Sequence, residues 1–212
     1  MSPLPLHQQL YLTAHDEQGN AYIHLSSLSL GLAGAIVLDL LLSERMVVHE
    51  GLVWAHPDHA TGDPLTTTVL QAIDHLEKHR SMLFWVRLIS SDAYDRVSGG
   101  LISAGLLSRV TRRKMGVRKD VFVPSDPGAT ARILSNALHL YHGRTAGDPM
   151  TAALCGLIGV LGLERGLDSA QGTTNQVRKR LRQVADEHAP AAGPILDLVG
   201  DLLGEAAIAV SR

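Results

Sequence analysis

The sequence is poor in three residue classes that many binding and catalytic sites need. Its single cysteine, Cys155, excludes a disulfide framework and a zinc site built from several thiolates. Aromatic residues make up only 4%, which argues against a base-stacking surface for nucleic acid. Charged residues make up 19% and the formal net charge is −2, which excludes a histone-like polycation. We therefore expect no nucleic-acid partner.

The chain has ample material for a hydrophobic core. It has 212 residues, of which 45% are hydrophobic, and this composition excludes wholesale disorder. The length suits one domain of ordinary size. We expect a single domain over residues 8–210 and a flexible N-terminus over residues 1–7, where two prolines precede the first apolar segment.

Two apolar stretches have a bearing on membrane insertion. Residues 25–42 are long enough to span a bilayer but include three serines and Asp39, whereas residues 150–163 are too short. Both are therefore expected to be buried core helices. The first basic residue is Arg45, so we do not expect a secretory signal. We expect a cytoplasmic location instead. Arginine exceeds lysine by 15 to 4, which favours a GC-rich bacterial genome.

The hydrophobic pattern predicts a mainly α-helical fold, with a single helical domain around a buried apolar helix and a projecting β-hairpin. A short apolar element is expected at 10–14, and strand-like character is expected at 46–54 around a turn at 49–51. The two strands of the projecting hairpin are expected at 106–113 and 117–123, with Gly116 in a tight turn. The expected helices are 29–42, 65–79, 92–107, 130–142, 149–163, 176–188 and 194–210.

Eleven histidines raise the alternative of a metal enzyme. His75 and His79 are four residues apart on an expected helix, and His56 and His59 lie upstream. However, the segment from His75 to His79 does not have the H-E-x-x-H order that places a general base beside a zinc-bound water. The sequence also has neither a G-x-S-x-G nor a G-x-x-x-x-G-K-[ST] motif. We expect no enzyme, no metal and no cofactor, and rank the histidine-metal enzyme third.

The expected hairpin is the most basic segment of the chain. Residues 108–119 contain six basic residues and no acid: Arg109, Arg112, Arg113, Lys114, Arg118 and Lys119. Guanidinium groups bind phosphate in a bidentate manner, and each basic group near an anionic leaflet contributes about 1 kcal/mol. The segment therefore predicts binding to anionic phospholipid head groups. A solubilised surface hairpin or an oligomer contact is the alternative interpretation.

Four segments, in this order, resemble the Golgi phosphoprotein 3 family in its bacterial branch. Each segment is short, but order and spacing agree over most of residues 8–210. The segments are the Gly31-Leu-Ala-Gly34 helix that ends before Arg45, Thr61-Gly-Asp-Pro-Leu65 leading into residues 70–76, residues 101–107 before the basic hairpin, and Phe122-Val-Pro-Ser-Asp-Pro127 after it.

The resemblance implies a mainly α-helical fold and a non-enzymatic peripheral membrane protein. Eukaryotic members of the family bind phosphatidylinositol 4-phosphate and act as adaptors for Golgi glycosyltransferases. Their hairpin, which corresponds to residues 108–123 here, contributes to self-association and membrane contact. We accordingly expect a cytoplasmic protein that is peripheral on the inner face of the membrane, with head groups and other proteins as partners and a homo-oligomer formed through the hairpin.

The resemblance also implies a lipid pocket, but its residues are substituted here. The family pocket uses a tryptophan and three arginines, and the matching positions are His24, Ala33, Asp95 and Asp92. Two carboxylates would repel a phosphate. Arg87 and Arg96 are the candidates to replace the missing arginines. Two hypotheses therefore stay open: binding of anionic, phosphoinositide-like head groups, and a protein–protein adaptor or self-associating scaffold without lipid binding.

Overall fold

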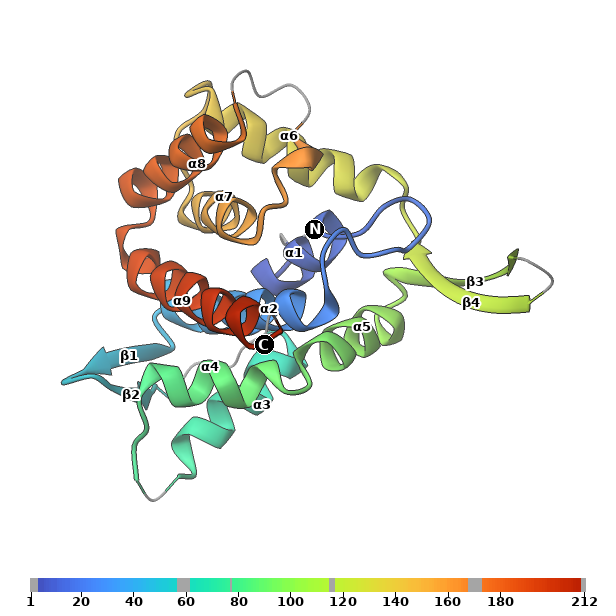
Figure 1. Ribbon diagram of the computed structural model, residues 1–212. Coiled ribbons are helices and arrows are strands. Elements are labelled where there is room, and N and C mark those ends of the chain that lie inside the picture. Colours follow the sequence, from blue (N-terminus) through green and yellow to red (C-terminus); the bar gives the residue numbers. More distant parts are fainter. Residues whose placement is uncertain (1–3, 57–61, 77, 115–116, 168–172, 211–212) are drawn as a thin grey trace.

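The computed structural model describes residues 4–56, 62–76, 78–114, 117–167 and 173–210, and the side chains of 112–120 and 209–210 are outside this description. The described part is mainly α-helical, as the sequence predicts, with two separate two-stranded antiparallel sheets (Figure 1). The α-helices are α1 Leu6–Thr13, α2 Leu25–Leu42, α3 Pro64–Asp74, α4 Met82–Ser90, α5 Ala93–Ser103, α6 Gly128–Tyr141, α7 Pro149–Leu161, α8 Thr174–His188 and α9 Gly193–Val210. The strands are β1 Met46–His49, β2 Leu52–Ala55, β3 Leu107–Lys114 and β4 Val117–Pro124.

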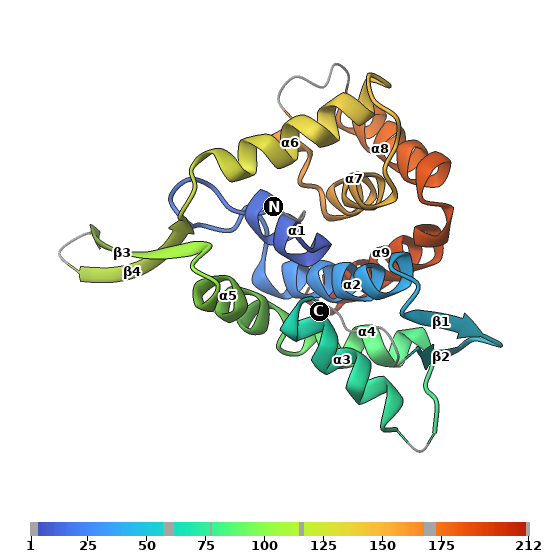
Figure 2. The same ribbon diagram turned by 180° about the vertical axis from the view of Figure 1, so that it is seen from behind.

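Helix α2 is the centre of the fold. Every residue from Gly31 to Leu40 is buried, and α1, α4, α7 and α9 pack around the helix (Figures 1 and 2). By length and composition α2 could cross a membrane, but 61% of it is buried inside the protein. The predicted buried helix is thus confirmed, and it begins at Leu25, four residues earlier than its apolar pattern suggests.

Glycines on α2 allow its neighbours to approach closely. A Cβ at Gly31 would overlap the Leu161 side chain of α7. A Cβ at Gly34 would lie 2.7 Å from Cγ2 of Val199 on α9. The absence of a side chain at these two positions therefore sets the distance at which α7 and α9 pack on the central helix.

Local signals fix the ends of the helices that surround α2. Asp63 caps α3 by accepting a hydrogen bond from the Thr66 amide at 2.8 Å, and Pro64 occupies the first turn. Asp148 caps α7 in the same way and is likewise followed by a proline. Gly162 ends α7 in the left-handed region, with φ of 72°.

The two β-hairpins project from opposite ends of the molecule (Figures 1 and 2). The β1–β2 turn includes Glu50 and Gly51, both with positive φ, and confirms the expected turn at 49–51. Strands β3 and β4 pair in register from Leu107 opposite Pro124 to Lys114 opposite Val117. The projecting hairpin is thereby confirmed, while Gly116 of its expected turn lies outside the described residues.

Several predicted boundaries need correction, and helix α7 ends at Leu161 rather than at residue 163. The N-terminus is not flexible as far as residue 7, because Leu6 and His7 are 0% and 1% exposed and belong to α1. Helix α3 ends at Asp74 rather than at residue 79. Helix α5 ends at Ser103 rather than at residue 107, since Gly105 adopts a φ of 69° and redirects the chain into β3.

Candidate functional site

The β3–β4 hairpin gathers the basic segment into one ribbon. The backbone register places Arg112 opposite Lys119 and Arg113 opposite Arg118. Nearer the base, Arg109 is exposed and pairs with Phe122 on the other strand. All six predicted basic residues therefore belong to a single two-stranded element. The side chains of residues 112–120 lie outside the described part of the structure. Their contact with lipid therefore stays a prediction.

The base of this hairpin is fixed to the body of the protein. Leu107 is only 5% exposed, and the Ser125 amide donates to the Leu106 carbonyl at 2.9 Å. Gly19, with φ of 77°, lies so close to the Phe122 carbonyl that a Cβ would overlap it. The ribbon is thus a projecting arm whose base packs against the body of the protein.

The four positions expected to match the family lipid pocket carry no arginine and lie at or within α2 and α5. Ala33 is 0% exposed inside α2, so a ligand in solvent cannot reach it. His24 is exposed at the start of α2, and Asp92 and Asp95 are exposed at the start of α5. No hydrogen bond or ion pair among the described residues joins any two of the four. The two carboxylates also occupy the end of α5 where the helix dipole would otherwise attract an anion.

The two substitute arginines already have acidic partners. Nη2 of Arg87 on α4 lies 2.8 Å from a carboxylate oxygen of Glu205 on α9. Nε of Arg96 on α5 lies 3.8 Å from a carboxylate oxygen of Asp92, the residue that precedes this helix. Exposed pairs of this kind are weak, but each carboxylate offsets the positive charge that would attract a phosphate.

The histidine-metal hypothesis loses its geometric basis. Because α3 ends at Asp74, His75 and His79 do not share a helical face. Nδ1 of His75 donates to the Gln71 carbonyl at 2.7 Å, and the His79 ring stacks on Trp54. Within the described ranges, no group of three or more metal-ligating side chains occurs. His59 lies outside those ranges.

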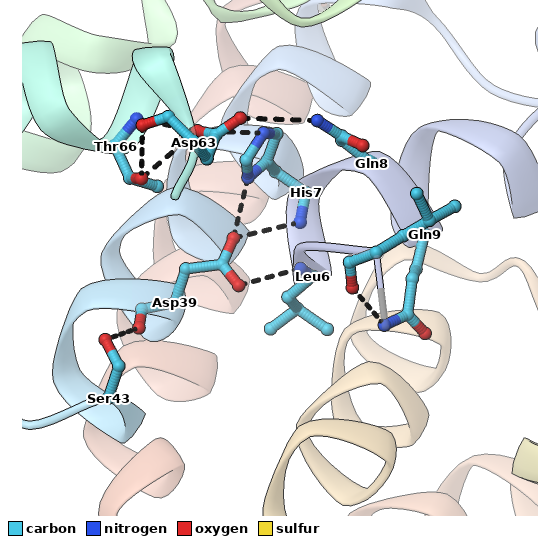
Figure 3. A network of polar contacts seen from close by, with 9 residues as sticks. Leu6, His7, Gln8, Gln9, Asp39, Ser43, Asp63 and Thr66 are labelled. Carbon is cyan, nitrogen blue, oxygen red and sulfur yellow. Dashed lines mark hydrogen bonds and ion pairs between the residues drawn. The ribbon is translucent and has the colours of Figure 1, made fainter. Parts of the chain in front are cut away.

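A buried polar network joins α1, α2 and α3 (Figure 3). The Asp39 carboxylate accepts hydrogen bonds from the backbone amides of Leu6 at 2.7 Å and His7 at 3.2 Å, and it lies 2.6 Å from Nδ1 of His7. The other ring nitrogen of His7 is 3.7 Å from a carboxylate oxygen of Asp63. Asp39 therefore caps α1 from the last turn of α2, and Asp63 caps α3 on the other side of the same histidine.

This network is a structural support. His7 and Asp39 are 1% and 6% exposed, and no serine or cysteine side chain in the described residues donates to His7. A buried carboxylate needs such partners, because an unpaired charge in the core is costly. The sequence analysis missed the network, although one acid inside the apolar stretch Leu25–Leu42 was a signal for it.

A second buried cluster links α1 to α5. Nδ1 of His15 lies 2.7 Å from the Tyr11 carbonyl, which can only accept, so Nδ1 carries the proton. Nε2 then accepts from the Tyr94 hydroxyl at 3.1 Å. Burial lowers the pKa of His15 and raises that of Tyr11. The cluster thus keeps an uncharged imidazole beside two aromatic rings.

A cavity of about 640 Å³ lies elsewhere in the described part of the chain. The end of α7 and the start of α8 form it, and Tyr22, Arg165 and Arg178 are among its lining residues. Arg178 is paired with Glu164 at 2.7 Å. None of the residues predicted to bind lipid lines this cavity, so it adds nothing to the basic hairpin.

Comparison with protein families finds one match that covers nearly the whole chain. The model described as Golgi phosphoprotein 3 (GPP34) matches residues 6–207, from the first residue of α1 to the last turns of α9. Comparison with curated proteins finds no match. The family match begins at Leu6, the residue whose amide is capped by Asp39.

Proposed function

The chain belongs to the Golgi phosphoprotein 3 family, and from this premise we propose that it is a non-catalytic peripheral membrane protein that binds anionic, phosphoinositide-like lipid head groups. The observation that carries the proposal is the basic ribbon β3–β4, which has six basic residues and projects from one end of the molecule (Figure 1). The cytoplasmic, inner face of a membrane is the surface that it would contact.

The register of the ribbon favours an anionic partner. Two pairs of basic residues, Arg112 with Lys119 and Arg113 with Arg118, occupy directly opposite positions. Like charges at opposite positions disfavour strand pairing, and an anionic surface offsets this cost. At about 1 kcal/mol for each basic group, the ribbon supplies reversible attachment that depends on ionic strength.

The charge of the ribbon, rather than a shaped pocket, would select the ligand. Ala33 is buried and Asp92 and Asp95 are acidic at the positions where the family pocket has arginines. Without those arginines, we expect little preference for phosphatidylinositol 4-phosphate over other anionic lipids once surface charge is matched.

The chemistry of the buried groups supports a non-catalytic role. Burial raises the pKa of the Cys155 thiol to about 12, so it is protonated at neutral pH and is a poor nucleophile. The Asp39 carboxylate, which lies beside His7, accepts the first amide of α1 and so has a structural role.

Vesicle co-sedimentation tests the proposal. The protein should bind phosphatidylglycerol vesicles and phosphatidylinositol 4-phosphate vesicles of equal surface charge, and not phosphatidylcholine vesicles. The double variant Arg112→Glu with Arg113→Glu should lose this binding. Arg144→Glu with Lys179→Glu is the matched control, since it changes the net charge equally at exposed positions outside the hairpin. Absence of binding to every anionic vesicle at low salt would refute the proposal.

A second candidate function is a self-associating adaptor without lipid binding. The outer edges of β3 and β4 pair with no further strand among the described residues. The edge of a two-stranded sheet is a template for pairing with a strand of a second copy. Light scattering of the intact protein separates the two functions, because an oligomer that dissociates in the Arg112→Glu, Arg113→Glu variant, together with no vesicle binding, favours the adaptor.

A further inference from the structure

Helix α4 has an apolar outer face. Trp85, Val86 and Ile89 point into the core, as expected for a surface helix. On the outside, however, Leu83, Phe84 and Leu88 are 38%, 39% and 50% exposed. A surface helix normally presents polar residues to water, so apolar residues on both sides indicate that the outer face also meets an apolar environment.

This face continues onto the neighbouring hairpin. Leu52 forms a β-bridge with Ser81, the residue that caps α4, and the Val53 amide donates to the Arg80 carbonyl at 2.9 Å. Leu52 therefore lies next to the start of α4. Trp54, two residues along β2, and Val47, which is paired opposite Trp54, are on the same side of the β1–β2 ribbon as Leu52. Together with the exposed residues of α4 they form what we call the α4 face: Val47, Leu52, Trp54, Leu83, Phe84 and Leu88.

The α4 side of this face is bordered by basic residues. The segment 78–91 contains Lys78, Arg80 and Arg87 and no acid. Lys78 and Arg80 are exposed, and the guanidinium of Arg80 lies 5.4 Å from the centre of the Phe84 ring. The third, Arg87, is paired with Glu205. Apolar side chains bordered by cations are the combination that binds the interface of an anionic bilayer.

We propose that the α4 face is a second membrane contact, at the end of the molecule opposite the basic ribbon, and that its apolar side chains enter an anionic bilayer at head-group depth. The proposal rests on the proposed function and names the part of the protein that lies in the lipid. Lys78 and Arg80 would lie at the level of the phosphates. Trp54 would lie at the same depth, which is where tryptophan is enriched in membrane proteins.

One side of the β1–β2 ribbon packs on the body of the protein, because Met46 and Val53 are 2% and 0% exposed. The other side carries Val47, Leu52 and Trp54, which are exposed and continue the α4 face. Glu50, at the turn, is an exposed carboxylate and opposes binding to an anionic bilayer. Replacement of Glu50 should therefore strengthen vesicle binding.

Tryptophan fluorescence with phosphatidylglycerol vesicles tests the insertion directly. Trp54 is 39% exposed and Trp85 only 2%, so lipids brominated on the acyl chain should quench mainly Trp54. We expect quenching in the intact protein that is largely lost in Trp54→Phe. Vesicle binding without any quenching would overturn the inference.

A matched pair of variants tests how much the α4 face contributes to vesicle binding. Leu88→Ser and Leu25→Ser remove the same side chain at 50% and 51% exposure, but only Leu88 belongs to the α4 face. Leu88→Ser should weaken vesicle binding about fivefold, as expected for an apolar side chain that is half buried by lipid, and Leu25→Ser should not. Glu50→Gln should strengthen binding. Equal affinities for the two serine variants would overturn the inference.

The outcomes separate this inference from the proposed function. If Arg112→Glu with Arg113→Glu abolishes binding while Leu88→Ser has no effect, the ribbon binds lipid and the α4 face does not. If Leu88→Ser weakens binding while the hairpin variant has no effect, the α4 face stands and the ribbon proposal fails. A protein that binds no vesicle contradicts both.

Discussion

Nδ1 of His7 lies 2.6 Å from the carboxylate of Asp39, although the two residues are 32 positions apart. The same carboxylate accepts the first two amides of α1. The start of the chain is therefore joined to the centre of the fold by three contacts with one buried side chain. This relationship explains why α1 is ordered from Leu6, which its two upstream prolines did not suggest.

Asp39→Asn should destabilise the protein strongly. The amide has only one oxygen to accept from the Leu6 and His7 amides, and it places a donor beside the buried ring of His7. Breaking a buried, hydrogen-bonded pair costs about 3 kcal/mol. Urea unfolding should report a lower midpoint for this variant.

Asp16→Asn is the control for this prediction. Asp16 also accepts two backbone amides, from Gln18 and Asn20, but those bonds are exposed. Its replacement should cost less than about 1 kcal/mol, because water can substitute for the lost partner. Equal costs for the two variants would show that burial of Asp39 does not matter.

Stability should fall as the pH drops below about 6.5 because of His15. Burial is the largest cause and holds the pKa of His15 below its ordinary value of 6.5, although the Tyr11 carbonyl and Asp16 favour the charged form. Below pH 6.5 the unfolded chain therefore binds a proton that the folded chain does not, and the free energy of unfolding decreases by at most about 1.4 kcal/mol per pH unit.

His15→Gln isolates this contribution. Urea unfolding of both proteins at pH 7.5 and 5.5 cancels the other titrating groups in the comparison. The intact protein should lose more stability between the two pH values than the variant does. A pH dependence that is the same in both would mean that His15 is protonated equally in the folded and unfolded states.

Cys155 should resist alkylation in the folded protein. Burial raises its pKa to about 12, and Sγ lies 3.7 Å from the Ala137 carbonyl in the core. Iodoacetamide should therefore react slowly with the native protein between pH 7 and pH 9, and rapidly with the urea-unfolded protein. Fast labelling of the native protein that rises with pH in this range would contradict the assigned burial.

Two glycine substitutions should have opposite effects. Gly34→Ala places a methyl group 2.7 Å from Val199 and should cost about 1–3 kcal/mol by overpacking. Gly204→Ala, on α9, meets no atom within 4 Å and should stabilise the helix by about 0.5–1 kcal/mol. Thermal unfolding measures both. Destabilisation by Gly204→Ala would show that α9 is packed more tightly there than the structure indicates.

The parts of the fold that the sequence predicts well are those set by local patterns. The apolar run of α2 and the two strands around Lys114 follow from hydrophobic periodicity and turn residues. Helix α4 was not predicted, because a short apolar run of nine residues fits a buried strand as well as a helix. The end of α3 at Asp74 was also missed, since the apolar spacing continues to Leu76.

The candidate site likewise has a part that the sequence predicts and parts that it does not. The basic ribbon is local in sequence, so its six residues could be identified without a structure. The α4 face depends on segments that are distant in sequence, and only the fold shows that Leu52 lies beside Ser81. The partner of Asp39 could not be predicted for the same reason.

The salt dependence of vesicle binding tests the central claim most directly. The measurement is the partition coefficient of the intact protein on phosphatidylglycerol vesicles from 25 to 500 mM salt, beside phosphatidylcholine vesicles. A charged ribbon predicts binding that is strong at low salt, falls steeply as screening increases, and is absent on the neutral vesicles. Binding that is equal on both kinds of vesicle, or that does not change with salt, would contradict the account.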